Sequence, residues 1–176
     1  MKQSILGGVA ALLLASSNTV AATSTPKGFT DDFDAAIQSA KESNRLVYAC
    51  FSGSDWCGWC QRLDKEVLSK QAFLDGVSGD FVLLYVDTPN NKELLGEKAK
   101  TQNPKLVEKY EIRGFPTALI LDAEGKTVAQ TGYRRGGAAK YVKHLKALKK
   151  NAAEIQRVRA EIDKLEAQLQ KLENEE

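Results

Sequence analysis

The sequence predicts an α/β fold, in which helices cover both faces of a central mixed sheet and a further helix extends beyond it at the C-terminus. Two apolar, β-prone runs, 46–51 and 81–87, alternate with amphipathic segments. Two more strands, 117–122 and 127–132, are separated by a turn that contains glycine. Helical periodicity then continues from residue 137 to the end. The first strands are therefore expected to be parallel and the hairpin antiparallel.

The helices follow from spacing and from the residues that start or stop them. Apolar residues at intervals of four predict a helix over 31–43, capped by Thr30 or Asp31 and ended by Asn44. A second helical pattern begins at Cys57. The remaining expected segments are the rest of that helix to Lys70, a short helix and loop over 71–79, a helical turn around 93–100 and a brief helix over 105–110.

The N-terminal residues indicate export. Lys2 supplies a positive charge, and 5–15 form an apolar core of signal-peptide length, followed by small residues. We place cleavage after Ala22, with Ala21 as the alternative, so that 1–22 form a signal peptide. An uncleaved membrane anchor is the competing interpretation, although the apolar run is shorter than the ~20 residues that span a bilayer. A periplasmic or otherwise extracytoplasmic location, where disulfides persist, follows from export.

Composition narrows the function classes. The 176 residues are 43% hydrophobic and 27% charged, with a net charge of +2. This is globular composition, and the near-neutral charge without a basic stripe gives no reason to expect nucleic acid as a partner. We divide the chain after the signal peptide into a domain over 23–148 and a C-terminal amphipathic helix over 149–176.

Two cysteines with two residues between them, Cys57 and Cys60, stand where a strand pattern gives way to a helical one. The spacing places Cys57 in the first turn of the helix, where free backbone N–H groups and the helix dipole stabilise a thiolate. Cys57 is therefore expected to attack a substrate disulfide. Cys60, one turn further in, then resolves the mixed disulfide, so that a redox-active disulfide joins the two.

The cysteines have three alternative roles: zinc binding, haem attachment and a purely structural disulfide. A zinc site needs four ligands, but the chain has three Cys and a single His, His144, in the C-terminal helix, and no metal is expected. Haem attachment needs a His directly after the second Cys, where Gln61 stands. A purely structural disulfide remains an alternative, although so short a loop adds little stability.

The residues around the cysteines resemble the thioredoxin superfamily. Asp55-Trp56-Cys57-Gly58-Trp59-Cys60 and the later Gly114-Phe115-Pro116-Thr117 carry the resemblance, which covers about 30–148. It is closest to exported thioredoxin-like proteins with Ser-Asp-Trp-Cys and a lengthened middle. The resemblance implies a thioredoxin-like fold, thiol–disulfide oxidoreductase activity and no cofactor, because electrons come from another thiol protein.

The same resemblance implies a substrate-binding edge. It places a cis peptide bond before Pro116, facing the cysteines, and pairs the backbone of Phe115 with an extended substrate. A cis bond there would present an unpaired backbone edge to which a peptide can add. An ordinary trans Pro116 at the start of an edge strand is the alternative. Trp56 and Trp59 are expected to shape the apolar rim of the site.

The chain departs from thioredoxins beneath the cysteines. Their buried Asp falls on Cys50 or Phe51, depending on one inserted residue, and their Lys falls near Leu83. The buried proton relay is therefore expected to be absent, with Asp55 or Glu66 as weak candidates to replace it through water. Cys50 itself is read as a small buried core residue, the alternative being a third thiol that shuttles disulfides or is modified.

The direction of the redox chemistry is less constrained. Gly58 and Trp59 stand between the cysteines, without the His of strong oxidants or the Pro of typical reductants, and an aromatic there resembles bacterial disulfide isomerases. We therefore predict a protein that reduces or isomerises disulfides of exported proteins and takes electrons from an upstream thiol donor. The alternative is a non-catalytic coiled-coil adaptor or chaperone-like module.

The C-terminal segment carries a heptad seam. Apolar residues alternate at spacings of three and four: Ile155, Val158, Ile162, Leu165, Leu169 and Leu172. Ile155 and Ile162 fall at a, and Leu165 and Leu172 fall at d. This pattern favours a parallel homodimer through 149–173. Packing of the seam on its own domain and docking to another protein are the alternatives.

Overall fold

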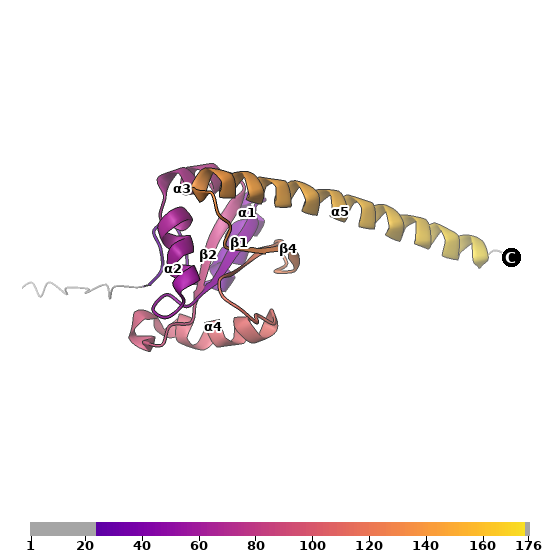
Figure 1. Ribbon diagram of the computed structural model, residues 1–176. Coiled ribbons are helices and arrows are strands. Elements are labelled where there is room, and N and C mark those ends of the chain that lie inside the picture. Colours follow the sequence, from indigo (N-terminus) through magenta and orange to yellow (C-terminus); the bar gives the residue numbers. More distant parts are fainter. Residues whose placement is uncertain (1–23, 175–176) are drawn as a thin grey trace, which may run out of the picture.

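The computed structural model describes residues 24–174 as a four-stranded sheet between two layers of helices, with one long helix running out from the domain (Figure 1). The predicted signal peptide over 1–22 lies outside the described residues. The elements in chain order are α1 (Phe33–Ser43), β1 (Leu46–Ser52), α2 (Gly58–Leu63), the π-helical η1 (Asp64–Leu68), α3 (Gln71–Val77), β2 (Phe81–Asp87), the 3₁₀ turn η2 (Lys92–Leu94), α4 (Glu97–Lys109), β3 (Thr117–Leu121), β4 (Thr127–Gly132) and α5 (Gly137–Glu173).

The sheet is mixed, as predicted. Its strand order is β2-β1-β3-β4. Strand β1 runs parallel to β2, with Leu46 opposite Phe81, and antiparallel to β3, with Phe51 opposite Thr117. Strands β3 and β4 form the antiparallel hairpin. Because β1 lies in the centre, the chain that leaves its C-terminal end toward Cys57 passes close to the start of β3.

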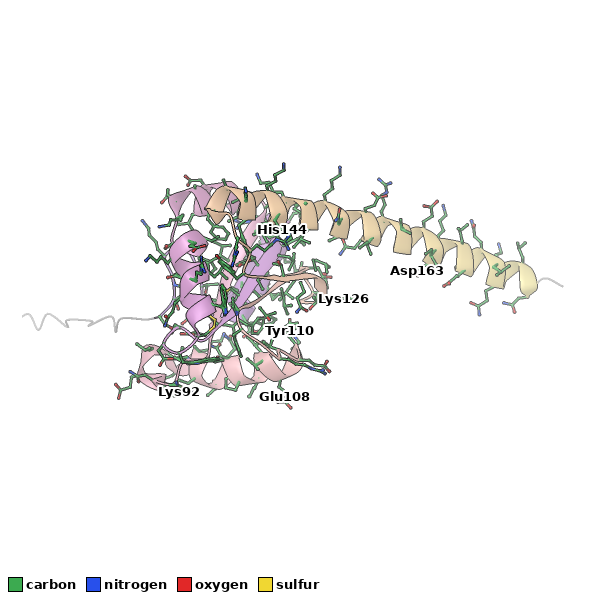
Figure 2. The ribbon with its side chains drawn as sticks, in the orientation of Figure 1. Lys92, Glu108, Tyr110, Lys126, His144 and Asp163 are labelled. Atoms are coloured by element: carbon green, nitrogen blue, oxygen red, sulfur yellow. A yellow bond between two sulfur atoms is a disulfide. The ribbon has the colours of Figure 1, made fainter. Side chains whose placement is uncertain are left out.

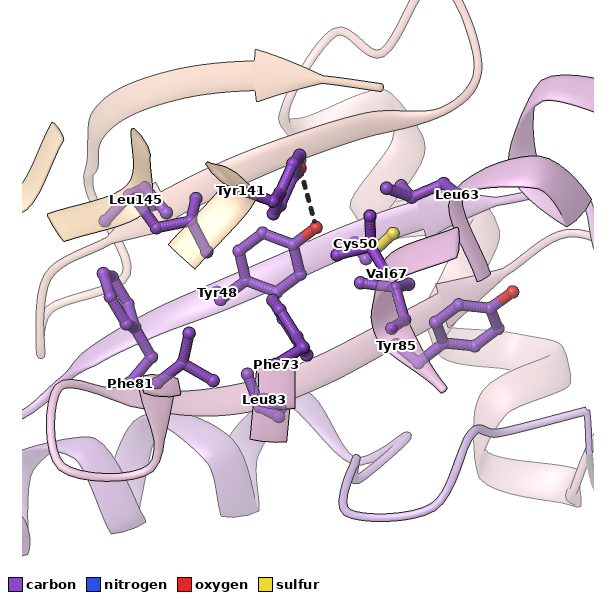
Figure 3. Packing of buried hydrophobic residues seen from close by; sticks show 14 residues of the cluster. Tyr48, Cys50, Leu63, Val67, Phe73, Phe81, Leu83, Tyr85, Tyr141 and Leu145 are labelled. Carbon is purple, nitrogen blue, oxygen red and sulfur yellow. Dashed lines mark hydrogen bonds between the residues drawn. The ribbon is translucent and has the colours of Figure 1, made fainter. Parts of the chain in front are cut away.

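The two faces of the sheet bury separate hydrophobic clusters. On one face Tyr48 and Cys50 of β1 pack with residues of α2, η1, α3 and α5 (Figure 3). On the other face Val47 and Phe51 pack with residues of α1 and α4. The period-two alternation along β1 sorts these side chains between the faces, as expected for a strand buried on both sides.

Two helix predictions need correction. Helix α1 begins after Asp32, whose carboxylate accepts the N–H of Ala35, so the cap is neither Thr30 nor Asp31. Thr30 instead forms a parallel bridge to Leu84 at the sheet.

The second correction concerns the segment around Pro104. The predicted turn over 93–100 and helix over 105–110 are largely one continuous helix, α4, with Pro104 inside it. Proline removes one internal hydrogen bond. Tertiary contacts outweigh that loss, because Ala99 and Leu106 are buried and the amide of Asn103 donates to the Asp87 carbonyl at 2.7 Å.

Helix α5 joins two different environments. Its first part packs on the domain through Tyr141, Leu145 and Ala152, all buried. Farther along, the helix runs past the domain and its side chains, such as that of Asp163, are exposed (Figure 2). None of the helices within residues 24–174 combines the length and the apolarity needed to cross a bilayer.

Candidate active site

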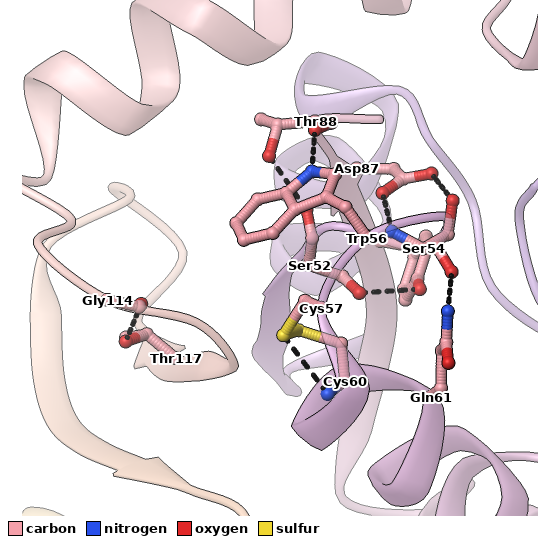
Figure 4. The surroundings of a disulfide bond; sticks show 11 residues. Ser52, Ser54, Trp56, Cys57, Cys60, Gln61, Asp87, Thr88, Gly114 and Thr117 are labelled. Carbon is pink, nitrogen blue, oxygen red and sulfur yellow. Dashed lines mark hydrogen bonds between the residues drawn. A yellow bond between two sulfur atoms is a disulfide. The ribbon is translucent and has the colours of Figure 1, made fainter. Parts of the chain in front are cut away.

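Cys57 and Cys60 lie at the N-terminus of α2 and form a disulfide (Figure 4). Cys57 is the N-cap of the helix, one position earlier than predicted, and its Sγ accepts the N–H of Cys60 at 3.2 Å. A sulfur in this position receives a backbone donor and the positive end of the helix dipole, which favour the thiolate after reduction. Cys57 is 7% exposed and Cys60 3%, so Cys57 is the more accessible residue of the pair.

The loop before Cys57 is clamped to the segment that follows β2. The Ser54 N–H and hydroxyl both donate to the Asp87 carboxylate, at 2.9 and 2.6 Å. The Asp55 carboxylate accepts the backbone N–H groups of Asn90 and Asn91, each at 2.9 Å. These hydrogen bonds lower the pKa of Asp55, and the bond from Asn91 has the largest effect. Asp55 is therefore committed to holding the loop, and it is a poor candidate for a proton relay.

Trp56 is fixed by the same loop and stays accessible. Its indole Nε1 donates to the Thr88 carbonyl at 2.8 Å (Figure 4), yet 46% of the residue remains exposed. A Cβ at Gly53 would overlap the indole ring, so glycine is required there. The ring packs edge-on against Phe115, with centroids 5.4 Å apart. Trp56 and Phe115, far apart in sequence, thus form one apolar edge.

The Phe115–Pro116 peptide bond is cis, the form that the resemblance implies. Pro116 immediately precedes β3, whose first residue Thr117 lies opposite Phe51 near the end of β1. The Thr117 hydroxyl donates to the Gly114 carbonyl at 2.8 Å and closes the turn before the strand. This register brings the Pro116 segment to the end of the sheet from which the Cys57 loop departs.

Trp59 belongs to a second cluster, which the sequence did not reveal. Its ring, in a residue 50% exposed, packs on Tyr133 at 5.3 Å, and the Arg62 guanidinium lies 5.5 Å from both ring centroids. Glu66 accepts the Tyr133 hydroxyl at 2.6 Å and Arg62 Nε at 2.7 Å. The Tyr133 hydrogen bond, followed by that of Arg62, lowers the pKa of Glu66. Glu66 therefore supports the rim and is not positioned as a relay.

Beneath the disulfide the core is apolar where thioredoxins carry charges. Cys50, Phe51 and Leu83 are all buried, and Cys50 is in no disulfide. Burial raises the pKa of the Cys50 thiol to about 12, so it stays protonated, as expected of a core residue. Within residues 24–174 no group of three or more His, Cys, Asp or Glu side chains is arranged to hold a metal ion.

One acidic side chain in this region was missed by the sequence analysis. Asp64 follows Cys60 by four residues, and its Oδ1 is buried without a hydrogen-bond partner in the described part of the chain. Burial raises the pKa of its carboxyl. The spacing of four from Cys60 on a predicted helix was the signal that could have identified it.

Comparison with known proteins settles the family. A model of the thioredoxin-like domain matches residues 33–149. The chain belongs to the thioredoxin-like family. This confirms the fold predicted from the sequence.

Individual relatives agree in the chemistry that their names describe. The chain is 31% identical over 117 residues to the disulfide bond reductase DsbH of Chlamydia pneumoniae, covering 66% of this chain and 70% of that protein. It is 33% identical over 101 residues to the thioredoxin-related protein DsbJ of the same organism, covering 57% of this chain but only 29% of DsbJ. A solved DsbH oxidoreductase superposes with a TM-score of 0.63 at 26% identity, covering 79% of this chain and 94% of the other. The predicted class, thiol–disulfide oxidoreductase, is thereby confirmed.

Proposed function

We propose that this chain reduces or isomerises disulfides of exported proteins, with Cys57 as the nucleophile and Cys60 as the resolving thiol. The observation that carries the assignment is the position of Cys57 Sγ, which caps α2 and accepts the Cys60 N–H, in the more exposed residue of the pair. The name of the relative DsbH, a disulfide bond reductase, supports the reducing direction.

The reaction follows from this arrangement. The Cys57 thiolate attacks one sulfur of a substrate disulfide, and the other substrate sulfur leaves as a thiolate. Cys60 then attacks Cys57 Sγ, which forms the Cys57–Cys60 disulfide and releases the second substrate thiol. Two electrons have passed to the substrate, and an upstream thiol donor must return them. No cofactor takes part in the proposed cycle.

We further propose that substrates dock between the two aromatic edges. Trp56 and Phe115 form one edge, Trp59 forms the other, and the backbone around Pro116 adds to an extended substrate segment. Both tryptophans are about half exposed although they are held by neighbouring groups, Thr88 for Trp56 and Tyr133 for Trp59. Fixed apolar surface of this kind binds unfolded or partly folded segments with little loss of side-chain entropy.

Activity assays test the proposal and separate it from the adaptor alternative. The native protein should reduce insulin and repair scrambled ribonuclease, and Cys57→Ala should abolish both. Cys50→Ala is the matched control, because it removes a buried thiol outside the disulfide and should keep most of the activity. Undiminished activity in Cys57→Ala would contradict the enzymatic assignment and favour the non-catalytic adaptor or chaperone-like module.

A redox titration tests the direction. A protein used to reduce or isomerise should have a potential well below that of strong oxidants, and a value near or above about −130 mV would contradict this direction. The relative named DsbH supports reduction, whereas the isomerising reading depends on Trp59 alone.

The proposed setting is the periplasm or another extracytoplasmic compartment, reached through cleavage of residues 1–22. The charge and apolar pattern of that segment support this. Expression of the full chain in a Gram-negative host, followed by fractionation and intact-mass measurement, should give a periplasmic protein that begins at Thr23. A cytosolic protein that retains residue 1 would contradict export.

We also propose a homodimer through 149–173. The six seam residues are 47–63% exposed, so within the described structure the apolar stripe is largely open to solvent. Light scattering at micromolar concentration should show a dimer. Leu165→Lys, at a d position, should give a monomer, whereas Ala167→Lys, at an outer f position of the same turn, should not. A monomeric native protein would remove the proposal.

A further inference from the structure

Asp64 stands one helical turn beyond the resolving cysteine. Its backbone N–H donates to the carbonyl oxygens of both Cys60 and Gln61. The helix is therefore continuous from Cys60 to Asp64. Side chains four residues apart lie on one helix face, and each leans toward the helix N-terminus. The Asp64 carboxyl is therefore directed back over the turn that holds Cys60.

The surroundings of this carboxyl are unusual for a charged group. Its Oδ1 is buried and has no hydrogen-bond partner in the described chain, whereas the residue as a whole is only half-buried. The titratable groups close enough to interact with it are Cys50 on β1, Tyr85 on β2 and the Lys70 ammonium before α3. An unpaired buried carboxylate is costly, which favours its uptake of a proton.

Other carboxylates near the site are engaged. Asp55 accepts two backbone N–H groups, Asp87 accepts both donors of Ser54, and Glu66 accepts Tyr133 and Arg62. For Asp55 and Glu66 these bonds stabilise the ionised form and lower the pKa, which makes each a poorer base. Asp64 differs in having a raised pKa, which comes from burial and is opposed by Lys70.

We propose that Asp64 accepts the proton of Cys60 when the mixed disulfide is resolved. This inference rests on the proposed function. The Cys60 thiol transfers its proton to the Asp64 carboxylate, and the resulting Cys60 thiolate forms a bond to Cys57 Sγ. The bond between Cys57 and the substrate sulfur breaks, and the substrate leaves as a thiolate that takes a proton from water. Asp64, half-buried, then returns its own proton to solvent.

The assignment explains how a site without a charged residue on the strand beneath it deprotonates a buried thiol. Cys60 is 3% exposed, so hydroxide and buffer have little access to it. Asp64 has one carboxyl oxygen in the interior, but the residue as a whole is only partly buried. It can therefore carry a proton from the buried Cys60 thiol to solvent. The buried Asp and Lys of thioredoxins, which the sequence predicts to be absent, lie on strands. Asp64 differs from them because it lies on the helix that follows the cysteines.

A stopped-flow reaction with 5,5′-dithiobis(2-nitrobenzoate) tests the proposal. In the reduced native protein, the first thionitrobenzoate released reports attack by Cys57, and the second reports displacement by Cys60. Asp64→Asn should slow the second phase about a hundredfold at pH 7, the scale of general-base catalysis, and leave the first phase within about twofold. The matched control is Asp75→Asn, the same substitution at an exposed carboxyl of α3, which should change neither phase. Cys60→Ala should release only the first equivalent.

The pH profile gives a readout that a merely structural role would not move. In the native protein the second phase should lose rate in acid as Asp64 becomes protonated. The native rate should then level off once Asp64 is ionised, whereas in Asp64→Asn this plateau should disappear and the rate should keep rising about tenfold per pH unit with the ionisation of Cys60 itself. Asp64→Glu should restore part of the rate.

The outcomes separate the two proposals. A second phase at the native rate in Asp64→Asn would overturn the role of Asp64 and leave the oxidoreductase function standing. Insulin reduction that survives in Cys57→Ala would instead overturn the function itself. The native profile also decides alone if Asp64→Asn does not fold, because a native second phase that keeps rising about tenfold per pH unit, without a plateau, contradicts the proposal.

Discussion

The two halves of α5 carry similar apolar periodicity but have different surroundings. In the near half, Tyr141, Leu145 and Ala152 are buried against the domain. In the far half, every apolar seam residue from Ile155 to Leu172 is about half exposed or more. Periodicity thus predicts a helix and the face it offers, but it does not say what that face packs against, and helix stability in proteins comes mainly from that packing.

The near half is also tied to the domain by polar contacts. The Tyr141 hydroxyl lies 3.1 Å from that of Tyr48 on β1 (Figure 3), and Lys149 Nζ donates to Asp80 at 2.7 Å. Tyr141 and Leu145 belong to the hydrophobic cluster that also contains Cys50 of β1 and Leu63 of α2, the helix that begins after Cys57. The near half is therefore part of the fold that supports the site, and the far half is free for the proposed association.

The largest expected difference between the two halves is the loss in free energy of unfolding when one leucine in each is replaced by alanine. Leu145→Ala should lower the free energy of unfolding by about 3 kcal/mol, because it removes a fully buried side chain and leaves a cavity. Leu165→Ala, the same change on the exposed seam, should leave the domain's unfolding almost unchanged at concentrations where the chain is monomeric. Urea denaturation followed by circular dichroism measures both. Equal losses would show that the halves do not differ as described.

The comparison also indicates which elements a sequence can predict. Strands β1 and β2 were identified because continuous apolar runs suit a strand covered on both faces. The predicted cap of α1 was wrong because Thr30, Asp31 and Asp32 are all residue types that cap helices, and the bridge of Thr30 to the sheet is not visible in the local pattern. The predicted break in α4 was wrong because Asn103 acts through a contact with Asp87, which the local pattern does not contain. Pro104 is a strong local stop signal, and only burial of the residues around it overrides that signal.

The residues of the candidate site also divide into those that the sequence could predict and those that it could not. Cys57, Cys60 and the edge residues could be found because their spacing and types are local features. Tyr133 could not, because its contact with Trp59 is formed between a helix and the end of a hairpin strand far away in sequence. The spacing of four residues between Cys60 and Asp64 is visible in the sequence. The burial of the Asp64 Oδ1 is not, because Asp64 is followed by further charged residues in η1 and the segment therefore looks exposed.

The polar contacts of the near half are expected to contribute less to stability than its buried apolar side chains. Tyr141→Phe should lower the free energy of unfolding by about 1 kcal/mol, because it removes the hydroxyl that contacts Tyr48 and donates to the Gly132 carbonyl at 3.1 Å. A double-mutant cycle with Tyr48→Phe isolates the part due to the two hydroxyls. A coupling energy of zero would show that this contact does not anchor the near half.

The smallest expected effect is a pH dependence confined to the near half. His144 contacts the Thr131 hydroxyl at 2.9 Å, and burial, with a smaller contribution from Arg134, lowers its pKa below 6.5. The folded state therefore holds the neutral imidazole more firmly than the unfolded chain does. Its contribution to stability is complete above pH 6.5 and is lost as the pH falls through the lower, folded-state pKa.

His144 is the single histidine of the sequence, so one substitution isolates this dependence. His144→Gln keeps a polar group near Thr131 and should flatten the fall in thermal midpoint between pH 7.5 and about 5.5. Leu165→Ala, in the far half, should keep the native slope over the same range. Parallel slopes for the native protein and His144→Gln would mean that the imidazole is as well solvated in the folded protein as in the unfolded chain, which would contradict the packing described for the near half.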